Sequence, residues 1–178
     1  VPREREPVAP TRRTSIILVV HQDSPVRSVA ELIALARANP GRLNFGSSGS
    51  GSAMHIATEI MLRVANIQAT HIPYKGSAET VAALLARQLD FSFDPGVAVP
   101  HIKANRLRLL AVARPTRMTQ FPDTPTMAEA GTDVDMDVVF GFYSRAGTPR
   151  EIVARLNREI VRIMQTAEAL ATLNAIGA

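Results

Sequence analysis

The chain of 178 residues contains no cysteine. That absence excludes disulfide scaffolds, thiolate zinc sites and cysteine nucleophiles together. It leaves the cellular compartment open, because a protein without thiols is indifferent to the surrounding redox potential. Long apolar runs are absent as well, since the run from Ile16 to Val20 ends at His21 and Gln22. Such a run is too short to cross a bilayer, so we expect no membrane-spanning segment.

Lysine is scarce: Lys75 and Lys103 are the only two, although the formal net charge is +4. Arginine therefore carries the positive charge, and its residues are scattered along the chain. Aromatic residues do not interleave with them, as a binder of single-stranded nucleic acid would require. We expect a solvated basic surface and no nucleic-acid partner.

The residues that are present are typical of a globular protein. A hydrophobic fraction of 46% can fill the core of one compact domain. The charged fraction of 20%, with 12 prolines and 10 glycines, excludes disordered, collagen-like and coiled-coil classes. The first ten residues, VPREREPVAP, are charged and lack the apolar centre of a signal peptide, which suggests a mature product or a fragment.

Strands and helices are expected to alternate along the chain, which predicts an α/β fold with a mostly parallel sheet flanked by helices. Serine or threonine caps, several of them followed by glutamate, predict helix starts at Ser28, Ser77, Thr126 and Thr148. A further short helix is expected around 97–104. The longest helix follows Thr148 and carries an apolar stripe. The expected strands are 14–20, 43–45, 69–72, 90–93, 107–113 and 134–142.

The segment GSSGSGS, residues 46–52, links a short strand to a helix and is the main candidate site. Backbone N–H groups, serine hydroxyls and a helix dipole can there receive one anion, either a phosphate or a carboxylate. The alternative is a flexible turn with a serine cap. The segment matches none of three known motifs. A nucleotide-binding P-loop would need a lysine at its end, and a dinucleotide-binding motif would need a small residue where Met54 stands. The G-x-S-x-G motif of hydrolases is also absent from the loop.

Two further segments are expected at the same cleft. Tyr74, Lys75 and Gly76 follow a predicted strand, where ligand crevices form in open α/β sheets. Alternatively, Tyr74 packs at the sheet edge and Lys75 is solvated. Asp94 follows another strand, and its carboxylate would fix a loop, hydrate the site or pair with a donor on the ligand.

The four histidines are far apart in sequence and lack metal-ligand spacing, so no metal site is expected. His55, one turn into the helix after the glycine-serine loop, either supports the carbonyls of that loop or reaches the same anion. No histidine and aspartate accompany a strained serine, so neither catalysis nor a cofactor is expected.

Taken together, the chain resembles the Bug family, the extracytoplasmic solute-binding receptors of tripartite tricarboxylate transporters. The resemblance covers nearly the whole chain from about residue 11 onward. Asn105 departs from it, because glycine is expected in the turn before LRLLAVA. The matching blocks are DSPVRSVAELIALARANPGRLNFGSSGSGSAMH, HIPYKGSAETVAALLARQLDFSFD, RLRLLAVARPTRMTQFPDTPTMAEAG and GFYSRAGTPREIVARLNREI.

The resemblance implies a three-layer lobe like those of periplasmic binding proteins, and a chain that lacks the family's first lobe. It implies an extended segment 1–11, the second ligand-binding lobe at 12–140, and a returning helical segment 141–178 that normally packs toward the first lobe. An apolar stripe on that helix would then lose its partner and pack back on this lobe or against another copy, giving a homo-oligomer through residues 149–166. The stripe comprises Ile152, Leu156, Ile160 and Ile163.

The resemblance further implies a periplasmic, non-enzymatic receptor that closes on a small carboxylate and delivers it to a membrane permease. The alternatives are a ligand-sensing module of a regulatory or signalling system and an anion-binding enzyme domain. The ligand contacts carried over from the family fall on Ser48, Gly49, Ser50, Gly51 and Ser52, with Tyr74, Lys75, Gly76 and Asp94 nearby.

Overall fold

The computed structural model describes residues 4–175, and these form two compact units. The central unit runs from Ser15 to Asp137. The terminal unit combines the two ends of the chain, up to Thr14 and from Val138 onward. The expected functional boundaries at residues 12 and 140 remain predictions.

The central unit is built on a sheet with strand order β3-β2-β4-β1-β5. Strand β2 pairs in parallel with both β3 and β4, whereas β1 pairs antiparallel with β4 and with β5. The predicted α/β class with a mostly parallel sheet is therefore confirmed, and β1 is the strand that runs the other way. The strands are β1 (Arg5–His21), β2 (Asn44–Ser47), β3 (Thr70–Pro73), β4 (Phe91–Asp94) and β5 (Leu107–Ala113).

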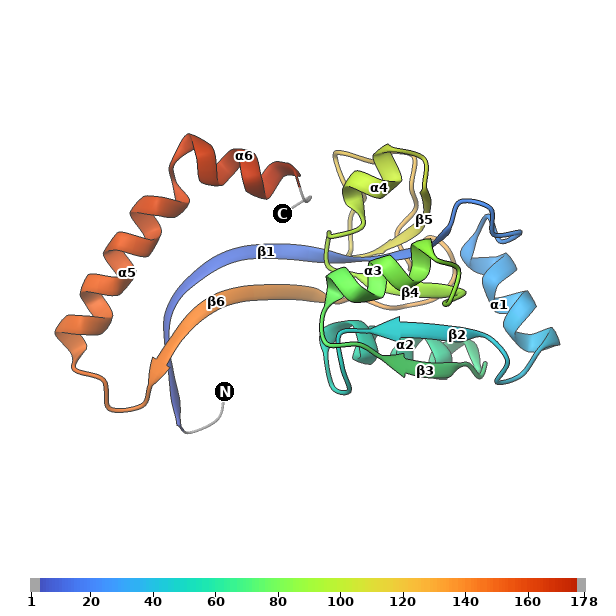
Figure 1. Cartoon of the computed structure of the whole chain (residues 1–178), viewed down its shortest axis with the longest axis horizontal. Helices are drawn as coiled ribbons and strands as arrows, with labels where there is room; N and C mark the ends of the chain where they lie inside the picture. The colour runs from blue at the N-terminus through green and yellow to red at the C-terminus, as the bar shows by residue number, and fades with distance from the viewer. Residues whose placement is uncertain (1–3, 176–178) are drawn as a thin grey trace. The chain divides into compact units, whose positions relative to one another are not determined.

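Helices cover both faces of this sheet. Helices α2 and α3 lie on opposite sides of β2 and β4, and each contacts both strands (Figure 1). Such crossover helices between parallel strands are what the alternating pattern predicts. The helices of the central unit are α1 (Val29–Ala38), α2 (Ala53–Ala65), α3 (Ser77–Leu85) and α4 (Val99–Lys103).

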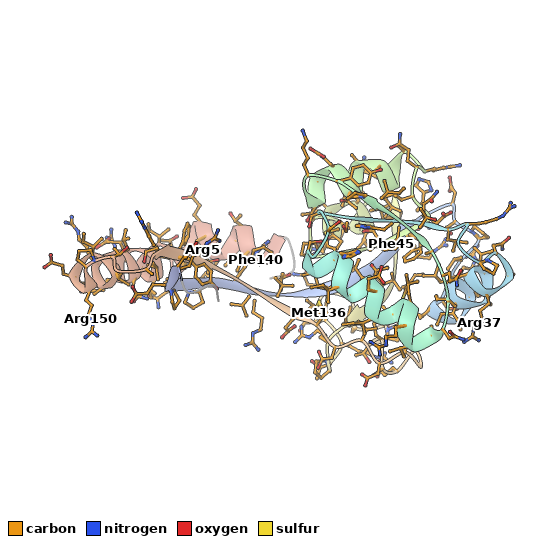
Figure 2. All side chains as sticks on the ribbon, turned by 90° about the horizontal axis from the view of Figure 1, so that it is seen from below. Arg5, Arg37, Phe45, Met136, Phe140 and Arg150 are labelled. Carbon is orange, nitrogen blue, oxygen red and sulfur yellow. The ribbon has the colours of Figure 1, made fainter. Side chains whose placement is uncertain are left out.

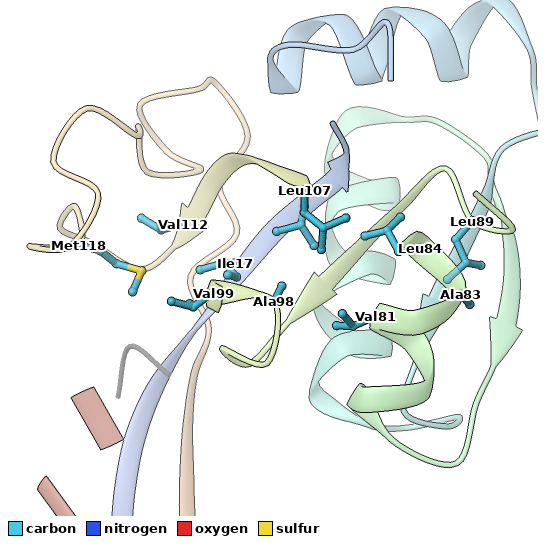
Figure 3. Close-up of a cluster of buried hydrophobic side chains, with 11 residues drawn as sticks. Ile17, Val81, Ala83, Leu84, Leu89, Ala98, Val99, Leu107, Val112 and Met118 are labelled. Atoms are coloured by element: carbon cyan, nitrogen blue, oxygen red, sulfur yellow. The ribbon is translucent and has the colours of Figure 1, made fainter. Parts of the chain in front are cut away.

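Strand β1 is the middle of the core. Its residues Ile16 to Val20 have no exposed surface, so the strand is buried on both faces. Ile17 and Val19 join a hydrophobic cluster that includes Leu84 of α3 and Val99 of α4 (Figure 3). Burial on both faces explains why this stretch is continuously apolar rather than alternating.

Two of the expected caps form, at Ser28 and Thr126. The Ser28 hydroxyl accepts the N–H of Glu31 at 3.2 Å, and Glu31 in turn accepts the N–H of Arg27 at 2.7 Å. Thr126 and Glu129 bond to each other's N–H groups reciprocally, at 2.8 and 3.1 Å. The chain after Thr126 makes a single turn, however, instead of the expected helix.

Two expected caps are wrong. Helix α3 starts at Ser77 with Gly76 as its N-cap residue, and the Ser77 hydroxyl donates to the sulfur of Met54 at 3.4 Å. Helix α5 has Pro149 as its N-cap residue, because the Thr148 hydroxyl donates to the carbonyl of Arg145 at 2.6 Å. In both cases the N-cap position falls one residue away from the expected one, and the hydroxyl instead donates to another acceptor.

The terminal unit contains the first part of β1 paired with β6 (Asp137–Arg145), followed by α5 (Arg150–Met164) and α6 (Ala167–Ala175). The Arg12 guanidinium lies 4.1 Å from the centre of the Phe140 ring, and Figure 2 labels Phe140 on this unit. Asn157 of α5 donates to the carbonyl of Val8 at 2.7 Å. Helix α5 has no buried residue, and Ile152, Leu156 and Ile163 are exposed by 46%, 44% and 55%.

This exposed apolar face of α5 generates a prediction about association. We expect the chain to self-associate through residues 149–166, because the burial of such side chains against a second copy removes apolar surface from water. Light scattering should give a mass above that of one chain, and Leu156→Glu should lower it, whereas Gln165→Glu at the end of the same helix should not. A single-chain mass at every concentration would contradict the prediction.

Helix α2 offers a matched pair for testing the core. Met61 is fully buried and Ile56 is 43% exposed on the same helix. Met61→Ala should lower the free energy of unfolding by about 2–5 kcal/mol through loss of packing, whereas Ile56→Ala should cost less than about 1 kcal/mol. Urea denaturation of both variants measures the difference, and equal losses would show that α2 is not packed as described.

Candidate functional site

Three segments with candidate ligand-binding residues meet at one edge of the central sheet. Strands β2, β3 and β4 run parallel, so their carboxyl ends lie at the same edge. The serine loop, defined as residues 48–52, follows β2, the segment 74–76 follows β3, and Asp94 ends β4. Crevices outside the carboxyl ends of parallel strands are the usual ligand sites of such sheets.

The serine loop combines two glycines of positive φ with a serine cap, and the cap is part of what the alternative expected. Gly49 and Gly51 have φ angles of +114° and +78°, which side-chain-bearing residues rarely adopt. Ser52 is the N-cap residue of α2, and its hydroxyl accepts the N–H of His55 at 3.3 Å. The loop therefore ends at the positive end of the α2 dipole.

The N–H groups of the loop fall into two sets. The N–H of Gly49 donates to the Ser47 hydroxyl at 3.2 Å, and the N–H of Gly51 donates to Nδ1 of His55 at 3.1 Å. Among residues 4–175, no hydrogen bond uses the N–H of Ser48 or Ser50. The two glycine amides hold the loop together, whereas the N–H groups of Ser48 and Ser50 take no part in these bonds.

A pair of stacked histidines lies behind the loop. The rings of His55 on α2 and His71 on β3 have centroids 4.2 Å apart at an interplanar angle of 28°. His71 also stacks on Phe45 at 4.9 Å, and its Nε2 lies 2.6 Å from the Ser47 hydroxyl. Figure 2 labels Phe45 inside the central unit, where it has no exposed surface. This group links β2, β3 and α2 directly to the loop.

Sequence reasoning missed the Ser47–His71 contact, which depends on strand register. Phe45 of β2 is paired with His71 of β3, so both side chains lie on the same face. Ser47 stands two residues after Phe45 and therefore shares that face. His55 was expected to support the carbonyls of the loop or to reach the anion, but its Nδ1 accepts an amide N–H instead.

The pKa of His71 is lowered, mainly because burial disfavours the charged ring. The neighbouring His55 lowers the pKa of His71 further, and Glu59 opposes both effects. The carboxylate of Glu59 lies 3.6 Å from Nε2 of His55. The lowered pKa favours the neutral form of the His71 ring.

The segment after β3 contains one packed and one solvated side chain. Tyr74 packs against the hydrophobic cluster on the α3 side of the sheet, and its N–H donates to the carbonyl of Ser47 at 2.9 Å. Lys75 is exposed, and its N–H donates to the Glu79 carboxylate at 3.1 Å. Tyr74 and Lys75 thus adopt the arrangement given above as the structural alternative, and their contact with a ligand remains a prediction.

Asp94 fixes a loop. It has no exposed surface, and its Oδ2 accepts the N–H groups of Gly96 and Ala98 at 2.7 and 2.8 Å. This is one of the three roles expected for it. The carboxylate orders the turn that leads into α4 at the same sheet edge.

This edge can bind an anion through neutral donors. Its groups are backbone N–H groups, serine hydroxyls and helix N-termini, with Lys75 as an exposed cation. Among the described residues, no group of three or more histidine, aspartate or glutamate side chains is placed to hold a metal ion. No described helix combines the length and apolar character needed to cross a membrane.

Comparison with known proteins identifies the family. Residues 2–177 match the profile of the tripartite tricarboxylate transporter family receptor. The chain therefore belongs to this family of solute-binding receptors, which confirms the resemblance seen in the sequence.

Curated relatives agree with this assignment. A UPF0065 protein of Pseudomonas sp., from the tcbD–tcbE intergenic region, is 35% identical over 98% of this chain and 53% of its own length. BugT of Bordetella pertussis is 32% identical over 97% of this chain and 53% of its own length. The chain thus spans about half the length of these relatives.

Solved structures share the fold. An R. palustris protein solved with adipate has a TM-score of 0.90 and 32% identity, covering 98% of this chain and 59% of that protein. MatC from Rhodopseudomonas palustris, with bound malate, has a TM-score of 0.94 and 26% identity, covering 99% and 61%. BugD is similar in fold alone, with a TM-score of 0.93 and 23% identity, covering 99% of this chain and 60% of that one.

The lowered pKa of His71 predicts how the stability of the folded chain changes at low pH. Because the folded chain binds this proton less readily than the unfolded chain, the stability from His71 is present above its ordinary pKa of 6.5 and is lost as the pH falls below it. NMR titration should place the His71 midpoint below 6.5, and Glu59→Gln should lower it further. His101, whose pKa is lowered by burial and by Arg106, is the control. Its titration midpoint should be the same in Glu59→Gln as in the wild-type chain. A His71 midpoint at or above 6.5 would contradict the prediction.

Proposed function

We propose that this chain contains the second ligand-binding lobe, at residues 12–140, of a periplasmic receptor for a small organic acid. The observation that carries the proposal is the serine loop at the start of α2, where the N–H groups of Ser48 and Ser50 are used by no hydrogen bond among residues 4–175. Membership of the receptor family and relatives solved with adipate and malate support a carboxylate as the ligand.

The proposed contacts are divided between direct and supporting roles. The serine loop receives one carboxylate group of the ligand through backbone N–H groups and hydroxyls, helped by the dipole of α2. Lys75 and the N-terminus of α3 add positive potential at the same sheet edge, while buried Asp94 orders the neighbouring turn. The proposed ligand-binding residues are Ser48, Gly49, Ser50, Gly51, Ser52, Tyr74, Lys75, Gly76 and Asp94.

The proposed mechanism is closure of two lobes on the ligand, with no covalent step. This chain covers 59% and 61% of the relatives solved with adipate and malate, so those proteins contain a further part that can supply the opposite side of a cleft. Residues 141–178 then return toward that part. The closed, ligand-bound form is recognised by the membrane permease of a tripartite tricarboxylate transporter, to which it delivers the acid.

Thermal unfolding with a panel of acids tests the proposal. A ligand at about 100 times its dissociation constant should add about 2.7 kcal/mol to the free energy of unfolding. Adipate, malate and monocarboxylates form the panel, with NAD, ATP and DNA as controls. We expect stabilisation by an acid and by none of the controls.

Variants show whether the serine loop is responsible. Ser48→Ala with Ser50→Ala removes two hydroxyl donors and should weaken binding about thirtyfold to several hundredfold, because each lost hydrogen bond to a charged group is worth about 1–2 kcal/mol. Thr116→Ala, at an exposed position of the central unit, is the matched control. Stabilisation only by NAD, ATP or DNA would contradict the proposed site, and equal affinity in the loop variant would contradict the proposed role of the two hydroxyls.

A further inference from the structure

Two histidines from different elements hold the two glycines of the serine loop. Nδ1 of His55 accepts the N–H of Gly51 directly, at 3.1 Å. Nε2 of His71 contacts the Ser47 hydroxyl at 2.6 Å, and that hydroxyl accepts the N–H of Gly49 at 3.2 Å. The glycine amides are therefore turned toward the histidine pair, and the alternate amides, of Ser48 and Ser50, are the ones left over.

We infer that His55 and His71 are positioning residues of the serine loop, and that His55 fixes Gly51 only while its ring is neutral, so that acid weakens ligand binding. The part of this inference that concerns affinity rests on the proposed function, and the part that concerns loop shape does not.

Protonation of His55 removes the contact that fixes Gly51. A neutral imidazole has one acceptor nitrogen, and here it is Nδ1, facing the N–H of Gly51. When Nδ1 gains a proton it becomes a donor and faces another donor, so the bond is lost. Gly51 has a φ of +78° and is exposed, and its turn is otherwise closed by one backbone bond, from the N–H of Ser52 to the carbonyl of Gly49 at 3.1 Å.

The stacked geometry makes the two rings sensitive to each other's charge. Their centroids lie 4.2 Å apart, so two positive rings would repel at short range beside the buried Phe45. The lowered pKa of His71, caused first by burial and then by His55, agrees with this arrangement.

The charged groups around the histidine pair do not cancel the repulsion between two positive rings. Glu59 of α2 faces the pair, 3.6 Å from Nε2 of His55, and favours the charged rings. Strand β2 contributes no ionisable side chain, and buried Asp94 of β4 is bonded to Gly96 and Ala98. Beyond β3, the Glu79 carboxylate accepts the N–H of Lys75.

The inference predicts that affinity for a carboxylate changes with pH in the direction opposite to the one that simple electrostatics predicts. Positive charge next to an anion site should strengthen the binding of a carboxylate when the pH falls. If the neutral rings position the loop, affinity falls instead, by about fivefold for one lost hydrogen bond. The direction of the change therefore separates a positioning role from a general field effect.

The first measurement follows the amide signals of Gly49 and Gly51 by NMR in the ligand-free full chain, between about pH 8 and pH 5. We expect the Gly51 signal to move, and its protection from hydrogen exchange to fall, together with the imidazole titration. His55→Asn keeps an acceptor oxygen near the Nδ1 position without a titratable ring, and its Gly51 signal should stay constant. His55→Phe keeps an aromatic ring without an acceptor, and its Gly51 amide should be unprotected at every pH.

The matched control is His21→Asn, because Nδ1 of His21 accepts the N–H of Asp23 at 3.1 Å in the same way but belongs to the end of β1. It should leave the response of Gly51 unchanged. The second measurement is the affinity for adipate at about pH 8 and about pH 5.5, compared with His55→Asn so that protonation of adipate itself cancels. We expect the wild-type chain to lose about fivefold more affinity than His55→Asn.

Two outcomes would overturn the inference: a Gly51 amide that does not respond through the imidazole titration, or a wild-type affinity that rises on acidification relative to His55→Asn. Failure of adipate to bind at any pH would count against the proposed function. The Gly51 measurement would still decide whether the histidines hold the loop.

Discussion

The parallel pairing of β2 with both β3 and β4 is the constraint on which the site depends. Parallel strands need crossover connections, and here these connections are α2 and α3, on opposite faces of the sheet. The same pairing brings the starts of both helices, and the turn after β4, to one edge. A single slip of register between β2 and β3 would separate His71 from Ser47 and turn their side chains to opposite faces.

The site relies on neutral donors rather than on a cationic clamp. Among its groups only Lys75 carries a fixed positive charge, and it is exposed. Backbone N–H groups in a loop shaped by positive-φ glycines need little reorganisation when an anion arrives, because the folded loop has already lost its conformational freedom. Buried carboxylates, represented by Asp94, serve the framework by holding amides in place.

Much of the fold could be predicted from the chain because the local patterns are strong. The buried strands at 14–20 and 107–113, the Ser28 cap and the order of elements are confirmed. Asn105, in the place where glycine was expected, has a φ of +54°, which asparagine tolerates better than most residues. The Ser77 and Thr148 caps failed because α3 begins one residue earlier than expected and α5 one residue later, so that neither hydroxyl stands at the N-cap position. The serine loop was recognisable from its glycines, but the histidine pair was not, because it depends on a register that one sequence does not reveal.

The Ser47 hydroxyl has one consequence that concerns the location of protons. Its oxygen lies within hydrogen-bond distance of three partners: the N–H and the carbonyl of Gly49, and Nε2 of His71. The Gly49 N–H can only donate, so the single hydroxyl proton points either to the Gly49 carbonyl or to Nε2. The orientation of the hydroxyl and the tautomer of His71 are therefore coupled. When Nε2 carries a proton, the hydroxyl donates to the Gly49 carbonyl, and when Nε2 carries none, the hydroxyl can donate to Nε2. The His71 ring, the Ser47 hydroxyl and the backbone of Gly49 therefore form one hydrogen-bond network. Its two arrangements differ only in the positions of hydrogen atoms.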